Sequence, residues 1–249
     1  MVPEYRKNTL KNMIKKNIPN AITCINAIGG TVASIFAVNP FEISGGLFHY
    51  QWTWLFIAIS MLADFFDGFA ARLLHVKSEM GKELDSLCDM VSFGVAPSIL
   101  MFGILTASDS APWWAWGAVA IAVGAALRLA KFNIDTRQTT SFLGLPVPAN
   151  AMFWIGYSAA IIGGITNLAS AWCFIPILLI VVYLMNSEVP LLSLKVSSWN
   201  LKDNIAQVIL IVGAATLIGL FGVQGLMWFV IFYLLVSLVV SRGALKPQK

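Results

Sequence analysis

The sequence predicts an all-α integral membrane protein, a polytopic bundle of about eight transmembrane helices. Only 11% of its 249 residues are charged, against roughly 25% in ordinary soluble domains, and 58% are apolar. So few charges cannot cover a globule of this size, which excludes a soluble single domain, a disordered chain and a nucleic-acid-binding domain. The charged residues also cluster, and the stretches between the clusters reach the roughly 20 residues that cross a bilayer.

Two charge-free stretches, 138–187 and 204–241, are long enough for two helices each, with glycine-containing turns at 163–167 and 222–225. The predicted helices lie near residues 21–40, 52–73, 85–107, 112–131, 148–166, 170–186, 204–220 and 224–241.

The basic residues orient these helices. All sixteen Lys and Arg residues fall in the N-terminal segment, in every second connection between helices, or at the C-terminus. Connections that face the cytoplasm carry the excess of Lys and Arg. Both termini are therefore predicted to be cytoplasmic, with an even number of spans.

The N-terminal segment 1–19 is predicted to form a short amphipathic interfacial helix. Leu10, Met13 and Ile14 form an apolar stripe beside Lys7 and Lys11, a pattern typical of helices that lie on anionic lipid. A short basic tail that only fixes the topology is the alternative.

Four of the twelve acidic residues lie where the second and third predicted helices meet on the cytoplasmic side. Asp64 and Asp67 are three residues apart and Asp85 and Asp89 are four apart, so each pair shares one helix face. The connection between the helices is short, so the two faces can converge. Ionisable groups at the edge of a membrane are costly and usually functional.

Carboxylates packed together repel one another, and two divalent cations would balance four of them. Oxygen ligands favour Mg²⁺, Mn²⁺ or Ca²⁺. The alternative is that the four carboxylates pair with Arg72, Lys77 and Lys82. Gly68 and Gly81 flank the aspartates; they either admit a ligand close to the backbone or serve helix packing.

These residues form a longer pattern. Asp64 begins the run Asp-Phe-Phe-Asp-Gly-Phe-Ala-Ala-Arg, and Gly81, Asp85 and Asp89 follow at fixed spacing. The pattern resembles the motif D-x2-D-G-x2-A-R-x8-G-x3-D-x3-D of the CDP-alcohol phosphatidyltransferase family, and every fixed position is present. The similarity covers about residues 15 to 190.

The resemblance implies transfer of a phosphatidyl group from CDP-diacylglycerol to a small alcohol, with release of CMP, at the cytoplasmic face of the cell membrane. It implies two cations, Mg²⁺ or Mn²⁺, with Ca²⁺ as an inhibitory or structural substitute, and a homodimer. The implied metal ligands are Asp64, Asp67, Asp85 and Asp89, with Asp89 also acting as the general base. The implied nucleotide-binding residues are Asn20, Thr23, Asp64, Gly68, Ala71, Arg72 and Gly81. For Asn20 and Thr23, ordinary helix capping is the alternative.

Three segments favour L-serine as the acceptor, because they resemble the serine-using branch of the family. They are 85–97, 126–133 and 142–149, and the second has Lys131 where that branch usually has Arg. The candidate residues for binding a lipid phosphate or serine are Ser92, Arg128, Lys131, Asn133 and Pro146. Alternatively, the two basic residues only set the topology, and the proline-containing loop only starts a helix.

Two other functions stay open. One is the same chemistry with glycerol 3-phosphate, inositol or inositol phosphate. The other is a cation transporter, which is disfavoured because all four carboxylates lie at one end of the bundle. The chain is expected to be a single membrane domain, residues 1–249, with a catalytic core at 20–190 and two C-terminal helices within 191–249.

Overall fold

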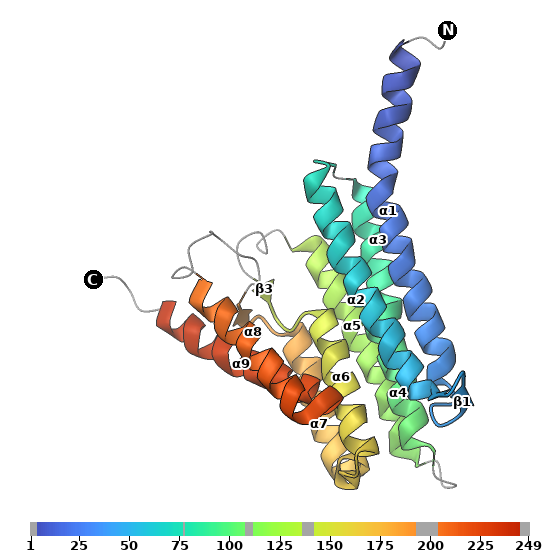
Figure 1. Cartoon of the computed structure of the whole chain (residues 1–249). Helices are drawn as coiled ribbons and strands as arrows, with labels where there is room; N and C mark the ends of the chain where they lie inside the picture. Colours follow the sequence, from blue (N-terminus) through green and yellow to red (C-terminus); the bar gives the residue numbers. More distant parts are fainter. Residues whose placement is uncertain (1–3, 77, 108–111, 136–141, 193–203, 245–249) are drawn as a thin grey trace.

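The computed structural model describes residues 4–76, 78–107, 112–135, 142–192 and 204–244, and it is a helical bundle (Figure 1). The α-helices are α1 Glu4–Ala37, α2 His49–Leu73, α3 Glu79–Asp89, α4 Ala96–Leu105, α5 Val119–Ile134, α6 Val147–Ile162, α7 Ala171–Asn186, α8 Ile205–Phe221 and α9 Gly225–Ala244. A π-helix, η1 Met90–Val95, joins α3 to α4, and 3₁₀ segments are η2 Trp113–Ala118, η4 Thr166–Ala169 and η6 Gly222–Gln224. Two-residue strands form two antiparallel pairs, β1 Ile43–Ser44 with β2 Leu47–Phe48, and β3 Phe142–Leu143 with β4 Pro190–Leu191.

Each predicted helix has a counterpart, and the long apolar helices confirm an all-α membrane protein. Within the described ranges, five helical segments are long and apolar enough to cross a membrane: Asn17–Ala37, His49–Leu73, Glu79–Leu105, Trp113–Ile134 and Ile205–Val240. The last contains both α8 and α9. Helices α6 and α7 are apolar but shorter, so the count of eight spans stays a prediction.

The first helix differs from its predicted bounds. α1 begins at Glu4 instead of near residue 21 and continues through Pro19 to Ala37. In Figure 1 its N-terminal part extends past the ends of its neighbours. Asn20 and Thr23 therefore lie inside the helix, and the capping alternative is wrong. The segment predicted to be a separate interfacial helix is continuous with the first span.

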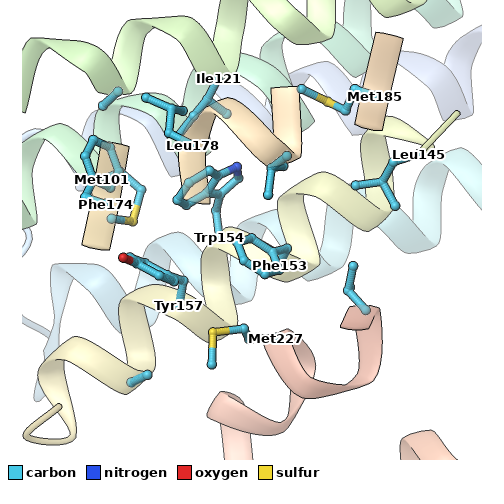
Figure 2. Packing of buried hydrophobic residues seen from close by; sticks show 14 of the residues in the cluster. Met101, Ile121, Leu145, Phe153, Trp154, Tyr157, Phe174, Leu178, Met185 and Met227 are labelled. Carbon is cyan, nitrogen blue, oxygen red and sulfur yellow. The ribbon is translucent and has the colours of Figure 1, made fainter. Parts of the chain in front are cut away.

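The largest hydrophobic cluster surrounds α6 (Figure 2). The Trp154 ring centroid lies 5.4 Å from that of Tyr157 and 5.9 Å from that of Phe174. The indole N–H of Trp154 donates to Asn150 Oδ1 at 2.8 Å, and Asn150 Nδ2 donates to the Phe93 carbonyl at 3.0 Å. Because Phe93 belongs to η1, this core also fixes the helix turn that follows Asp89.

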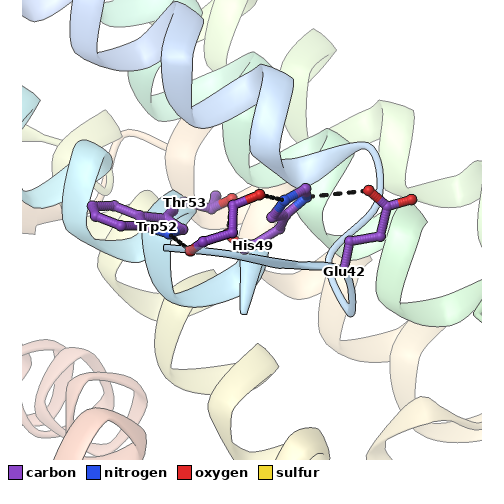
Figure 3. A network of polar contacts seen from close by, with 5 residues as sticks. Glu42, His49, Trp52 and Thr53 are labelled. Atoms are coloured by element: carbon purple, nitrogen blue, oxygen red, sulfur yellow. Dashed lines mark hydrogen bonds and ion pairs between the residues drawn. The ribbon is translucent and has the colours of Figure 1, made fainter. Parts of the chain in front are cut away.

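A polar network closes the connection between α1 and α2 (Figure 3). His49 Nε2 lies 2.8 Å from Ser44 Oγ, and His49 Nδ1 lies 3.9 Å from a Glu42 carboxylate oxygen. The Trp52 indole N–H donates to the Ser44 carbonyl at 2.8 Å. The network lies at the start of α2, while Asp64 and Asp67 lie toward its end.

Gly30 allows α1 to pack directly against η1. A Cβ atom at Gly30 would lie 2.6 Å from Ser92 Cα, a backbone atom. We expect Gly30→Ala to lower the free energy of unfolding by about 1–3 kcal/mol through overpacking. Gly219→Ala in α8 is the matched control, because a Cβ there meets nothing within 4 Å. Thermal unfolding in detergent measures both variants, and equal midpoints would contradict this account of the α1–η1 contact.

Candidate active site

Three carboxylates meet where α2 ends and α3 begins. One carboxylate oxygen from each of Asp64, Asp67 and Asp85 lies within 4.8 Å of the other two. The chain reverses direction through a short connection in which His75 has a φ of 53°, and the Ser78 hydroxyl accepts from the Gly81 N–H at 2.9 Å to start α3. The predicted convergence of the two helix faces is therefore confirmed for these three residues.

The cluster has no protein cation to balance it among the residues described. Asp64, Asp67 and Asp85 form no ion pair with a Lys, Arg or His residue of those ranges. Lys82 Nζ donates to the Asn133 carbonyl at 2.7 Å instead, and Arg72 is exposed. The alternative in which the carboxylates pair with Arg72 and Lys82 is therefore not observed. Lys77, the third residue of that alternative, lies outside the described residues.

Two carboxylate oxygens of the cluster, Asp67 Oδ2 and Asp85 Oδ1, are buried without a hydrogen-bond partner. An uncompensated buried charge is strongly unfavourable. Carboxylate oxygens that have no hydrogen-bond partner are suitable ligands for a hard divalent cation such as Mg²⁺ or Mn²⁺.

Asp89 is the last residue of α3 and is buried, but it does not belong to this close group of three. Its Oδ1 accepts from Asn26 Nδ2 at 2.8 Å. The Asn26 carbonyl in turn accepts from Ser60 Oγ at 3.0 Å and Ser92 Oγ at 2.9 Å. Asn26 on α1 is thus held by α2 and η1 while it holds Asp89. We did not predict Asn26 as a site residue; the available signal was an amide side chain inside an uncharged span.

A cavity of about 520 Å³ adjoins the carboxylates. Among its walls are predicted site residues from three helices: Asn20, Thr23, Asp67, Gly68, Ala71, Gly81 and Asp85. The predicted nucleotide-binding residues Asp64 and Arg72 are not in its lining. A Cβ at Gly81 would lie 3.0 Å from Asn20 Oδ1, so a larger residue there would crowd the junction of α1 with α3 at the cavity wall.

Of the five predicted acceptor residues, two line the same cavity and three lie at separate places. Arg128 and Lys131 line a second cavity of about 280 Å³. Ser92 is fully buried and its hydroxyl binds the Asn26 carbonyl. Pro146 is the N-cap residue of α6, which agrees with the helix-start alternative.

Asn133 lies between α5 and α3. Its Nδ2 donates to Ser86 Oγ at 3.0 Å and to Glu83 Oε2 at 3.2 Å. Together with the bond from Lys82 to its carbonyl, these contacts connect the end of α5 to the helix that carries Asp85 and Asp89.

The chain belongs to the CDP-alcohol phosphatidyltransferase family, whose model matches residues 16–199. Three similar proteins carry the name CDP-diacylglycerol–serine O-phosphatidyltransferase. The protein from Bacillus subtilis (strain 168) is 38% identical over 135 residues, which are 53% of this chain and 72% of the relative. The protein from Helicobacter pylori (strain J99) is 36% identical, over 54% of each chain. The protein from Methanocaldococcus jannaschii is 33% identical, over 56% of this chain and 59% of the relative. The matches with the last two thus span little more than half of those relatives.

Proposed function

We propose that this protein transfers the phosphatidyl group of CDP-diacylglycerol to the hydroxyl of L-serine, giving phosphatidylserine and CMP. The observation that carries the proposal is the group of three carboxylates within 4.8 Å beside a cavity of about 520 Å³. These carboxylates are fixed positions of the complete family motif, and the names of the three relatives support serine as the acceptor.

The carboxylates of Asp64, Asp67, Asp85 and Asp89 would hold two divalent cations, Mg²⁺ or Mn²⁺. When bound, such cations neutralise a pyrophosphate and stabilise the charge on the leaving CMP. The nucleotide would bind in the 520 Å³ cavity, whose walls include Asn20, Thr23, Gly68, Ala71 and Gly81. Arg72, which is exposed and does not line the cavity, would contact the nucleotide at the cavity's edge.

Asp89 would remove the proton from the acceptor hydroxyl, because an alcohol is a weak nucleophile at neutral pH. The new bond forms between the serine oxygen and the lipid-side phosphorus, and the bond from that phosphorus to the CMP oxygen breaks. Asn26 occupies Asp89 Oδ1, which leaves Oδ2 as the oxygen that accepts the proton.

We further propose eight spans in a single membrane domain, with both termini and the active site at the cytoplasmic face of the cell membrane. The distribution of basic residues and the apolar helical segments of the described ranges support this topology. The N-terminal part of α1 would contact the anionic inner leaflet through its basic residues. A homodimer is expected from the family resemblance.

The Asn26 side chain is proposed to position Asp89. Asn26→Leu keeps a similar volume but removes the amide donor, and a hydrogen bond to a charged group contributes about 1.5–3 kcal/mol. We expect kcat to fall about 10–100-fold, while KM for both substrates changes little. Ser60→Ala is the control, because it removes another contact of Asn26 and leaves the amide–carboxylate bond intact. Equal kcat values for the two variants would contradict the positioning role.

CMP release tests the proposed function. Purified protein is incubated with CDP-diacylglycerol, Mg²⁺ or Mn²⁺, and L-serine, glycerol 3-phosphate, inositol or inositol phosphate in turn. Release that depends on serine is expected. Release only with another alcohol would overturn the serine assignment, and no release with any of them would favour cation transport as the function of the carboxylates.

A further inference from the structure

The connection between α1 and α2 brings a hydroxyl, an imidazole and a carboxylate together. Ser44 Oγ lies 2.8 Å from His49 Nε2, and His49 Nδ1 lies 3.9 Å from a Glu42 carboxylate oxygen (Figure 3). Enzymes activate a serine in this way, with a base in hydrogen-bond reach of the hydroxyl and a third group that orients the base. These residues precede the family motif, which begins at Asp64.

The Glu42 carboxylate determines which nitrogen of His49 carries the proton. His49 Nδ1 is buried and has no hydrogen-bond partner, and it faces this carboxylate. A lone pair on Nδ1 would face a negative charge, so the tautomer with the N–H at Nδ1 is favoured. Nε2 then has the lone pair, and the Ser44 hydroxyl donates to it. General base catalysis requires a hydrogen bond in this direction.

The His49 ring has a fixed position relative to Ser44. Its side chain is 13% exposed, and its ring centroid lies 5.0 Å from that of Phe36 in an edge-to-face contact. The His49 backbone N–H donates to the Glu42 carbonyl at 2.8 Å. The Ser44 carbonyl accepts from the Trp52 indole N–H at 2.8 Å. Backbone and ring contacts therefore hold the three residues together before any substrate binds.

The Ser44 hydroxyl is accessible to a substrate. Ser44 is exposed at the end of β1, and Gly45 and Gly46 form the turn that follows, with φ values of 61° and 82°. A Cβ at Gly46 would meet nothing within 4 Å, so the space beside the turn is open.

The surface around Ser44 is apolar and lacks cations. Phe41, Ile43, Leu47 and Phe48 are 38–64% exposed. Glu42 is the only Asp, Glu, Lys or Arg residue between positions 17 and 63. The connection therefore offers no cation for a phosphate or carboxylate group, and its exposed apolar side chains suit an acyl chain. The chemistry favours a neutral acyl ester as the substrate.

We propose that Ser44 is the nucleophile of a second site, which hydrolyses neutral acyl esters. The Ser44 oxygen attacks the ester carbonyl carbon, and its proton passes to His49 Nε2. The ester C–O bond then breaks, and the leaving alcohol takes that proton. Water attacks the acyl–serine ester, His49 takes a proton from the water, and the Ser44 oxygen receives this proton as the fatty acid leaves. Glu42 stabilises the imidazolium between the transfers.

The second site is separate from the carboxylate cluster. Asp64 lies about 22 Å further along α2 than His49, at about 1.5 Å per residue. The proposal therefore does not depend on phosphatidyl transfer.

A fluorophosphonate probe tests the nucleophile in the purified full chain. Such probes react with serines that a neighbouring base activates, and ordinary serines react far more slowly. We expect peptide mass spectrometry to find the label on Ser44. Labelling of no residue, or only of residues other than Ser44, would overturn the proposal and reduce the Ser44–His49 bond to a contact that closes the connection.

His49→Gln distinguishes a base from a structural contact. The glutamine amide can still donate to Ser44 but has no basic nitrogen, so labelling should slow by about 10²–10⁴-fold. Glu42→Gln should slow it about two- to fivefold, as for a partly exposed ion pair. Ser170→Ala is the control, because the Ser170 hydroxyl donates to the Asn167 carbonyl at 2.7 Å; its labelling rate should not change. Normal labelling of folded His49→Gln would reject the base.

Hydrolysis of p-nitrophenyl octanoate tests turnover. We expect release of p-nitrophenol that Ser44→Ala abolishes and that EDTA leaves unchanged. CMP release should show the opposite pattern, with loss in EDTA and no change in Ser44→Ala. Ester hydrolysis that persists in Ser44→Ala, or that requires a divalent cation, would reject the second site whether or not the protein transfers a phosphatidyl group.

Discussion

Asp89→Asn is expected to abolish turnover while the protein stays folded. The substitution keeps the shape of the side chain and an oxygen that can accept from Asn26, so the α1–α3 contact is retained. It removes the atom that takes the proton, and general base catalysis contributes about 10²–10⁴-fold. The initial rate of CMP release measures the loss, and thermal unfolding in detergent measures the integrity of the fold.

Glu83→Gln is the matched control for this result. Glu83 lies on the same helix and is exposed, and a glutamine oxygen can still accept from Asn133. Its rate should stay within about twofold of the unmodified protein, as expected for a surface substitution away from the site. Near-normal turnover by Asp89→Asn would exclude the base role.

Asp85→Asn should weaken divalent cation binding and turnover together. It removes one of the three carboxylates that lie within 4.8 Å of one another. Loss of groups that only support metal ligands already costs about 10–100-fold in affinity or activity, so loss of a ligand should cost at least as much. Mn²⁺ titration followed by electron paramagnetic resonance reports binding without any turnover.

Although Asp85→Asn should weaken metal binding, it should not lower the stability of the metal-free protein. Removing one charge from a cluster without a protein cation relieves repulsion, so Asp85→Asn in excess EDTA should unfold at the same temperature as the unmodified protein or higher. EDTA should also stop CMP release by the unmodified protein, and added Mg²⁺ or Mn²⁺ should restore it. A variant that unfolds earlier in EDTA but binds Mn²⁺ normally would show that Asp85 is structural.

Hydrophobic patterning predicted the helices well because a bilayer demands long apolar segments. The turns at 163–167 and 222–225 were also correct, since Gly164 and Gly222 adopt φ values of 106° and 59°, which favour glycine. The start of the first helix was wrong, because the basic segment before Pro19 lacks a hydropathic signal although it continues the same helix.

The part of the site that could be predicted is the part fixed by residue spacing within one helix or across one short connection. The predicted carboxylate cluster is observed for this reason, because its members Asp64, Asp67 and Asp85 lie on two helices joined by such a connection. Asn26 reaches Asp89 across a separation of 63 residues, and no local pattern encodes such a contact. The composition of the 280 Å³ cavity likewise depends on how α5 and α7 pack.

The π-helix at Met90–Val95 gives the third span a tolerance to changes in length. A π turn accommodates one more residue than an α turn, whereas an added residue in a regular α-helix rotates everything beyond it by about 100°. Such a segment therefore absorbs a single insertion or deletion locally. Evolution can thus change the length of the apolar half of this span without turning Asp85 and Asp89 away from the carboxylates of α2.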